Sequence, residues 1–97
     1  MKASDLMIRC LEEEGVERIY GVPGEENADF MISLINSHIE FILCRHEQAA
    51  AFMADAYGRL TGKACVCLGT LGPGVTNLLT GIADGNMDRA PVVAIIG

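Results

Sequence analysis

Residues 64–97 read ACVCLGTLGPGVTNLLTGIADGNMDRAPVVAIIG, and this stretch decides the fold. It contains two apolar runs, residues 64–68 and 91–96, and neither alternates with polar residues. Between them lie a glycine-rich turn at residues 69–74 and a segment whose apolar residues recur at helical spacing. Apolar strands separated by a helix are typical of a parallel sheet that is covered on both faces. The stretch therefore predicts a strand, a turn, a helix and a parallel strand.

The same alternation extends back to the N-terminus. Helices are expected after Ser4, after Asn27 and from about Glu47, and strands at residues 16–22 and 39–44. Gly15 and Gly62 are placed to end the first and third helices in the left-handed conformation. The fold class is thus α/β: a three-layer α/β/α domain with a parallel sheet and right-handed crossovers. Because the sequence stops after the fourth strand, where a further turn and helix are expected, we interpret residues 1–97 as a fragment of a larger domain or as a protein that needs partners to complete its fold.

The third expected helix has an apolar side made of Ala50, Met53, Ala54, Tyr57 and Leu60, which predicts that these residues face the core.

The composition argues against several classes of binding partner. The 97 residues carry a formal net charge of −6, which argues against nucleic acid or an anionic membrane as the main partner, because both require a basic surface. The four cysteines lie in apolar runs and are expected to be reduced, buried thiols, and no spacing indicates a metal site. No apolar run approaches the roughly 20 residues of a membrane span. We therefore expect a soluble, cytoplasmic protein.

A ligand is expected where the strands of an open parallel sheet end. Three polar or glycine-rich segments occur there: residues 21–24, residues 45–48 (RHEQ) and residues 69–77. Glu47 is either a functional carboxylate or an acid that simply favours the positive end of a helix dipole. The glycine-rich turn could approach a phosphate, but it is neither Gly-x-Gly-x-x-Gly nor a Walker loop, and its spacing favours a tight strand-to-helix turn. The residues alone predict a ligand edge without naming the ligand.

Three strings carry a resemblance to a known family: YGVPGEEN from residue 20, RHEQAAAFMADAYGRLTGK from residue 45, and LGTLGPGVTNLLTGIADGNMDRAPVVAIIG from residue 68. In this order they resemble the large catalytic subunit of acetolactate synthase and related thiamine-diphosphate carboligases and decarboxylases. The resemblance covers essentially the whole chain. It implies that residues 1–97 are the N-terminal part of the domain that binds the pyrimidine of the cofactor.

The resemblance also implies roles for particular residues. Glu47 matches the carboxylate that hydrogen-bonds N1′ of the aminopyrimidine and favours the tautomer able to deprotonate thiazolium C2. Its neighbours Ala49, Ala50, Ala51 and Phe52 are expected to supply apolar surroundings for this carboxylate. Val22, with Pro23 and Gly24 in the same turn, matches positions against the pyrimidine ring. Pro73 and Asn77 match positions that line this ring from the glycine-rich turn, so the resemblance assigns that turn to the pyrimidine and not to the diphosphate.

The rest of the site lies outside these residues, according to the resemblance. The diphosphate and its Mg²⁺ are held by a separate C-terminal domain, and the active site forms between subunits of a homo-oligomer. Some members of the family also carry FAD in a middle domain. The expected reaction is decarboxylation of a 2-oxo acid such as pyruvate, followed by carboligation to a second 2-oxo acid in a branched-chain amino acid or acetoin pathway.

The sequence departs from the commonest pattern at two places. Leu71 stands where acetolactate synthases usually have Ser, and Pro-Gly-Glu-Glu replaces the frequent Pro-Gly-Gly at residues 23–26. Another thiamine-diphosphate decarboxylase or carboligase therefore stays open as the parent enzyme.

Two alternatives come from other classes. The chain on its own could be a non-catalytic assembly module that dimerises through its third and fourth helices. It could also be a nucleotide- or flavin-binding domain that uses residues 69–74, although no basic phosphate partner or acidic ribose reader accompanies this loop.

Overall fold

A computed structural model describes residues 2–96. The helices and strands alternate along the chain as α1 (Ala3–Glu13), β1 (Arg18–Gly21), the 3₁₀ turn η1 (Glu25–Asn27), α2 (Ala28–Ile35), β2 (Glu40–Leu43), α3 (Glu47–Thr61), β3 (Cys65–Gly69), α4 (Pro73–Met87) and β4 (Val92–Ile96). Across this part of the chain, no helix has the length and apolar character that a membrane crossing requires.

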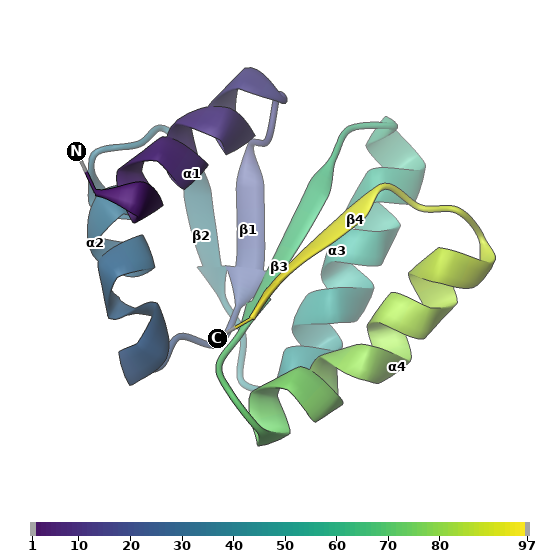
Figure 1. Cartoon of the computed structure of the whole chain (residues 1–97). Coiled ribbons are helices and arrows are strands. Elements are labelled where there is room, and N and C mark those ends of the chain that lie inside the picture. The colour runs from purple at the N-terminus through teal and green to yellow at the C-terminus, as the bar shows by residue number, and fades with distance from the viewer. Residues whose placement is uncertain (1, 97) are drawn as a thin grey trace.

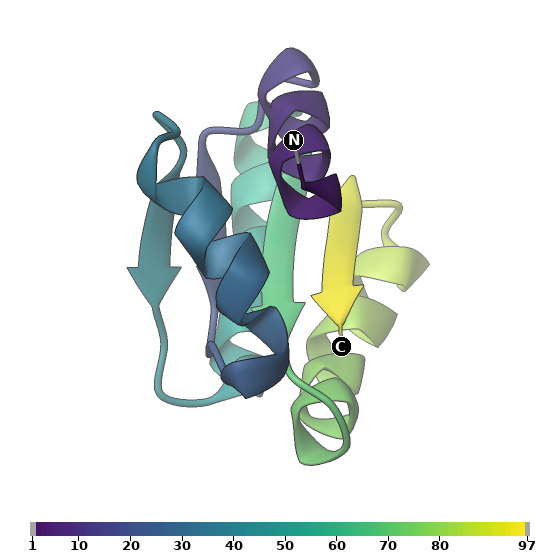
Figure 2. The ribbon, with the colours of Figure 1, turned by 60° about the vertical axis from the view of Figure 1, so that its left-hand side comes forward.

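The four strands form one parallel sheet in the order β2-β1-β3-β4. Helices α1 and α2 cover one face of the sheet, and α3 and α4 cover the other (Figures 1 and 2). The predicted three-layer α/β/α class is therefore confirmed. The chain leaves β1 towards β2 on one side and reaches β3 on the other, so the carboxyl ends of β1 and β3 flank a topological switch point, where open α/β sheets bind ligands.

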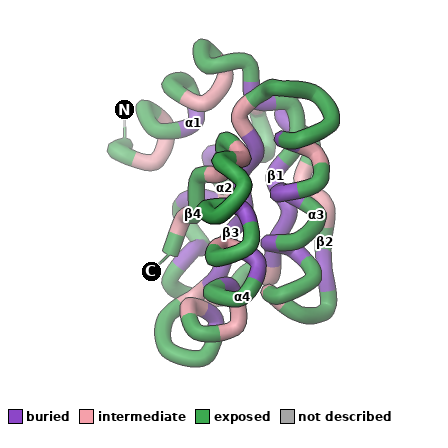
Figure 3. The backbone as a smooth tube through the Cα atoms, turned by 90° about the vertical axis from the view of Figure 1, so that its right-hand side faces the viewer, coloured by how far each residue is buried: buried purple, intermediate pink, exposed green. Residues whose placement is uncertain are grey.

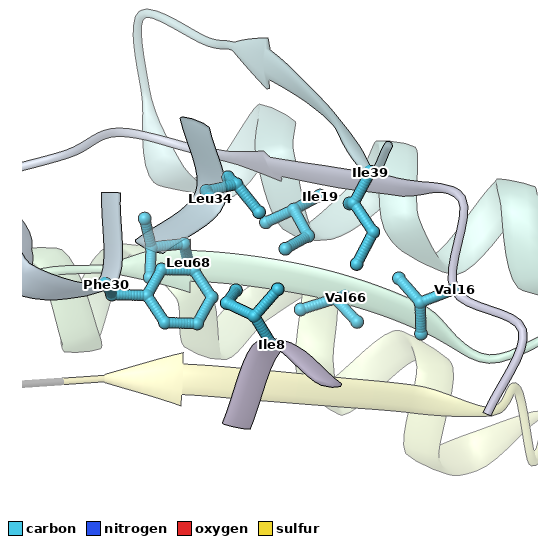
Figure 4. Close-up of a cluster of buried hydrophobic side chains, with 8 residues drawn as sticks. All are labelled: Ile8, Val16, Ile19, Phe30, Leu34, Ile39, Val66 and Leu68. Carbon is cyan, nitrogen blue, oxygen red and sulfur yellow. The ribbon is translucent and has the colours of Figure 1, made fainter. Parts of the chain in front are cut away.

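Two separate clusters of buried side chains lie on the two faces, because successive residues of a strand point to opposite sides. The cluster under α1 and α2 is built from large aliphatic and aromatic residues (Figure 4): Ile8, Val16, Ile19, Phe30, Leu34, Ile39, Val66 and Leu68. The cluster under α3 and α4 consists mainly of small residues and thiols: Tyr20, Cys44, Ala50, Ala51, Ala54, Cys65, Cys67 and Leu78.

Burial differs from the sequence prediction on the helices, whose outer sides are largely exposed in Figure 3. In α3, Met53 and Leu60 are exposed by 45% and 87%. The buried side of α3 instead carries Ala50, Ala51, Ala54, Asp55 and Gly58. The prediction is confirmed for Ala50 and Ala54 and wrong for Met53 and Leu60, because α3 lies too close to its neighbours to accommodate large side chains.

The cysteines are reduced thiols, as predicted, but only three of the four are buried: Cys10 on α1 is exposed. Burial raises the pKa of the thiols of Cys44 and Cys65, and raises that of Cys67 to about 12, so these three remain protonated at neutral pH.

Candidate functional site

The carboxyl ends of β1, β2 and β3 are held side by side by backbone hydrogen bonds that continue past the strands. The amide of Val22 donates to Leu68 O at 3.2 Å, and the amide of Cys44 donates to Gly21 O at 2.9 Å. A Cβ atom at Gly21 would lie 2.6 Å from Leu68 O, so only glycine permits this spacing of β1 and β3. The three loops predicted to form a ligand edge therefore lie at the same edge of the sheet.

The turn after β1 is joined to the glycine-rich turn after β3. Gly24 lies against Thr70, since a Cβ atom built at Gly24 would be 3.0 Å from the Thr70 side chain. Thr70 Oγ1 donates a hydrogen bond of 2.7 Å to Glu26 Oε2, and this bond lowers the pKa of the Glu26 carboxyl. The two loops therefore form one connected rim.

The glycine-rich turn is shaped to start a helix. Gly72 has φ of 67°, a conformation that favours glycine, and Pro73 occupies the first helical position of α4. The amides of Val75 and Thr76 both bond Gly72 O. The Thr76 bond is the first regular bond of α4, the Val75 amide is engaged within the turn, and Pro73 has no N–H to donate. The first turn therefore offers few of the free amides that an anion needs, which disfavours the phosphate-loop interpretation.

Glu47 opens α3 directly beside the first turn of α4. His46 caps α3, its Nδ1 accepting a hydrogen bond of 3.0 Å from the amide of Gln48. The side chain of Glu47 turns towards α4, where Asn77 Nδ2 donates to Glu47 Oε1 at 3.1 Å. The second oxygen, Oε2, faces Gly74, where a Cβ atom would lie 3.4 Å away. The sheet edge thus presents a half-buried carboxylate with one oxygen restrained by an amide and the other beside a residue without a side chain.

The remaining residues assigned from the resemblance lie around this pair. Val22 is half-buried and packs against the cluster under α3 and α4. Pro23 and Pro73 are exposed on their two loops, and Gly24 is half-buried in the rim. The structure thus brings Glu47 and Asn77 into direct contact and places Val22, Pro23, Gly24 and Pro73 on the loops of the same edge.

The surroundings of Glu47 are less apolar than the sequence suggested. Ala49, Ala50, Ala51 and Phe52 were expected to shield it, but only Ala50 and Ala51 are buried. Ala49 and Phe52 are exposed, because α3 turns that side away from the sheet. Only two of the four residues therefore belong to the buried part of the domain.

Sequence reasoning missed two groups of polar residues. One is the Glu26–Thr70 bond of the rim. The other is a set of ion pairs in which Arg59 of α3 contacts Asp55, Asp84 and Asp88. The four-residue spacing of Asp55 and Arg59 was a visible signal for an intrahelical pair. In contrast, the pattern gave no sign that Asp84 of α4 and Asp88, which directly follows α4, would also contact Arg59. Within residues 2–96, no three or more histidine, cysteine or acidic side chains are grouped so that they could hold a metal ion.

Comparison with known proteins shows the family of the chain. A family model described as thiamine pyrophosphate enzyme, N-terminal TPP binding domain, matches residues 1–97. The chain is 48% identical over its whole length to a probable acetolactate synthase large subunit of Methanocaldococcus jannaschii, of which it covers 16%. It is 44% identical over its whole length to the acetolactate synthase isozyme 2 large subunit of Escherichia coli (strain K12), and 46% identical over 99% of its length to an acetolactate synthase of Bacillus subtilis (strain 168). It covers 18% and 17% of these two proteins. With a match that spans every residue, the chain belongs to the family of N-terminal TPP-binding domains of thiamine pyrophosphate enzymes.

Proposed function

We propose that residues 1–97 form the pyrimidine half of a thiamine diphosphate site in an acetolactate synthase, and that Glu47 is the carboxylate that activates the cofactor. The observation that carries this proposal is the Glu47–Asn77 pair at the switch point of the sheet. A family match over the whole chain supports the same cofactor.

The residues at the sheet edge fit an aminopyrimidine. A flat heterocycle needs an acceptor or shared proton at its ring nitrogen, an apolar contact on its face and room for close approach of the backbone. Glu47 supplies the carboxylate, the half-buried Val22 supplies an apolar side chain, and Gly74 leaves the space beside Glu47 Oε2 that a Cβ atom would narrow. When bound, thiamine diphosphate supplies the electron sink for decarboxylation of a 2-oxo acid.

Each residue has a separable task in this mechanism. Glu47 shares a proton with the ring nitrogen N1′, which requires the carboxylate to be aimed at the ring. Asn77 restrains the carboxylate by donating to Oε1 at 3.1 Å. The Glu26–Thr70 bond holds the two loops that carry Val22–Gly24 and Pro73 at a fixed distance.

The rest of the enzyme lies in a longer protein in this proposal. The chain spans about a sixth of the length of the curated relatives it matches. Middle and diphosphate-binding domains elsewhere in that protein hold the diphosphate with Mg²⁺ and, in some members, FAD. The complete site forms between subunits of a cytoplasmic homo-oligomer and joins pyruvate to a second 2-oxo acid, for branched-chain amino acid or acetoin synthesis. The names of the three relatives support acetolactate as the product.

The test is Glu47→Gln in the full-length protein that contains this chain. This change keeps the size and the hydrogen bond from Asn77 but removes the shared proton, so we expect nearly complete loss of carboligation with unchanged circular dichroism. Glu13→Gln, on the exposed end of α1, is the matched control and should retain activity. Turnover by Glu47→Gln at the level of the wild type contradicts the proposal.

A second candidate function is a non-catalytic assembly module. It is favoured by large apolar side chains that are exposed on α3 and α4: Phe52, Met53, Leu60, Leu79 and Met87. This candidate predicts that the isolated chain forms oligomers on a sizing column and gives no calorimetric signal with thiamine diphosphate. The choice between acetolactate synthase and another decarboxylase of the superfamily is made by assaying the full-length protein with a series of 2-oxo acids.

A further inference from the structure

Helices α3 and α4 run side by side in a fixed register. Glu47 contacts Asn77, thirty residues later in the chain. The same offset relates Ala51 to Gly81, where a Cβ atom on the glycine would lie 2.4 Å from Ala51 Cβ, and Asp55 to Gly85, where it would lie 3.3 Å from Asp55 Oδ1. The contacts therefore repeat once per helical turn, and the glycines allow the two backbones to approach closely.

Arg59 joins the two helices two to three turns beyond the Ala51–Gly81 contact. Its guanidinium bonds Asp55 of its own helix (Nε to Oδ1, 2.7 Å), and it reaches Asp84 (Nη2 to Oδ2, 2.9 Å) and Asp88 (Nη1 to Oδ2, 2.6 Å) at the end of α4. Nη2 also donates to the backbone oxygen of Asp84 at 3.1 Å. A planar guanidinium with several fixed donors holds such an arrangement better than a single point charge does.

The burial of Asp55 limits the conformations that Arg59 can adopt. Asp55 is only 3% exposed, and a buried carboxylate requires a compensating charge. Arg59 therefore cannot leave Asp55 without a large cost, and α4 is tied to the one conformation of Arg59 that satisfies Asp55. We refer to Arg59, Asp55, Asp84 and Asp88 as the helix clamp.

The clamp bears on Glu47 because α3 is a continuous helix. Glu47 and Arg59 lie on the same helix, about 18 Å apart along its axis at roughly 1.5 Å per residue. A helix of this length moves nearly as a rigid rod, so a slip of α3 along α4 by about 1 Å at the clamp displaces Glu47 from Asn77 by a similar distance, and misplacements of this size can cost about 100-fold in rate.

We propose that Arg59 is a positioning residue that fixes the register of α3 against α4 and thereby holds the Glu47 carboxylate in place. The structural part of this inference stands on the contacts of the clamp, and its consequence for catalysis rests on the proposed function. No part of the clamp touches the cofactor edge, so its effect must pass through the helix pair.

The test is a double-mutant cycle in the full-length enzyme with thiamine diphosphate, Mg²⁺ and substrate present. The variant Asp84→Ala with Asp88→Ala, called the untied variant below, removes both acidic side chains that hold Arg59 at the end of α4 and leaves only the bond from Arg59 Nη2 to the backbone oxygen of Asp84. The buried Asp55–Arg59 pair stays intact, so folding is preserved. The second change is Asn77→Ala. We expect each change alone to lower kcat by about 10-fold with little change in KM. The combination should lower kcat by only about 10- to 30-fold, because both changes displace the same Glu47 carboxylate. Independent effects would instead multiply to about 100-fold.

The matched control is Glu13→Ala with Glu14→Ala, which removes two exposed carboxylates from the end of α1 across the sheet. Hydrogen exchange measured on the full-length protein gives a readout besides activity. Amides of residues 47–51 and 74–78 should exchange faster in the untied variant and not in the control. Arg59→Lys, which keeps the charge but loses the planar fork, should fall between the wild type and the untied variant.

Three results overturn the inference: a kcat of the untied variant equal to that of the control, multiplicative losses in the cycle, or unchanged exchange at residues 47–51. If the proposed function itself is wrong, the variant Glu47→Gln retains turnover. That result differs from the three above, so the two failures are distinguishable.

Discussion

The two faces of the sheet are stabilised in different ways. Beneath α1 and α2, large side chains such as Phe30 and Leu34 fill the space between helix and sheet. Beneath α3 and α4, alanines, glycines and thiols bring the backbones close, and the polar contacts of Glu47 and Arg59 join one helix to the other. Polar contacts also join α1 to α2, so the difference between the faces is the size of the packed side chains. Bulky packing stabilises one face, and we expect the close approach of α3 and α4 on the other face to position the candidate site.

The largest effect on stability is expected from removing bulk beneath α2. Phe30→Ala should lower the free energy of unfolding of residues 1–97 by about 3–5 kcal/mol, because it leaves a cavity that the rigid sheet cannot close. Urea unfolding measures this effect. Ile32→Ala on the exposed side of the same helix is the control, and equal losses from the two changes would contradict the assignment of this face to bulky packing.

A somewhat smaller effect is expected from adding bulk between α3 and α4. Alanine favours a helix interior over glycine by about 1 kcal/mol. Gly81→Ala should nevertheless destabilise the chain, by about 1–3 kcal/mol, because the added Cβ atom would meet Ala51 Cβ at 2.4 Å. Thr80→Ala, an exposed neighbour on α4, should have little effect. If Gly81→Ala stabilises the chain in thermal unfolding, the close approach of the two helices is wrong.

The smallest effect on stability is expected from the hydrogen bond between Ser33 of α2 and Asp5 of α1. Ser33 donates to Asp5 Oδ1 at 2.6 Å and lowers the pKa of the Asp5 carboxyl from its usual 3.8. A carboxyl whose pKa is lower in the folded than in the unfolded chain adds stability above the unfolded value, and this stability is lost as the pH falls through the folded value. Wild type should therefore lose more stability than Ser33→Ala between about pH 6 and about pH 3, as followed by urea midpoints. Equal losses of stability in the two proteins would show that this hydrogen bond contributes nothing to stability.

The parallel sheet was predictable from the sequence because its strands are short apolar runs bounded by turn signals. The end of α3 was also predictable, since Gly62 takes the left-handed conformation with φ of 72°. All four strands begin later than predicted: β1 at Arg18, β2 at Glu40, β3 at Cys65 and β4 at Val92. Hydrogen bonding to a neighbour, which apolar character alone does not encode, decides where a strand begins.

The buried sides of the helices were less predictable. Large apolar residues on α3, such as Met53 and Leu60, were expected inside, but the interior positions belong to alanine and glycine. Gly81 and Gly85, four residues apart on α4, were a signal for close helix packing that hydrophobic periodicity overlooks. The Glu47–Asn77 contact came from the resemblance to a family, because the spacing of the two residues does not reveal that α3 and α4 lie in register.

The most direct test of the central claim is a crystal structure of the full-length protein with thiamine diphosphate bound. The account predicts that a Glu47 carboxylate oxygen lies within about 2.6–3.2 Å of N1′ of the aminopyrimidine, with Asn77 still donating to the other oxygen. A structure in which the pyrimidine binds elsewhere, or in which Glu47 points away from its ring nitrogens, would contradict it.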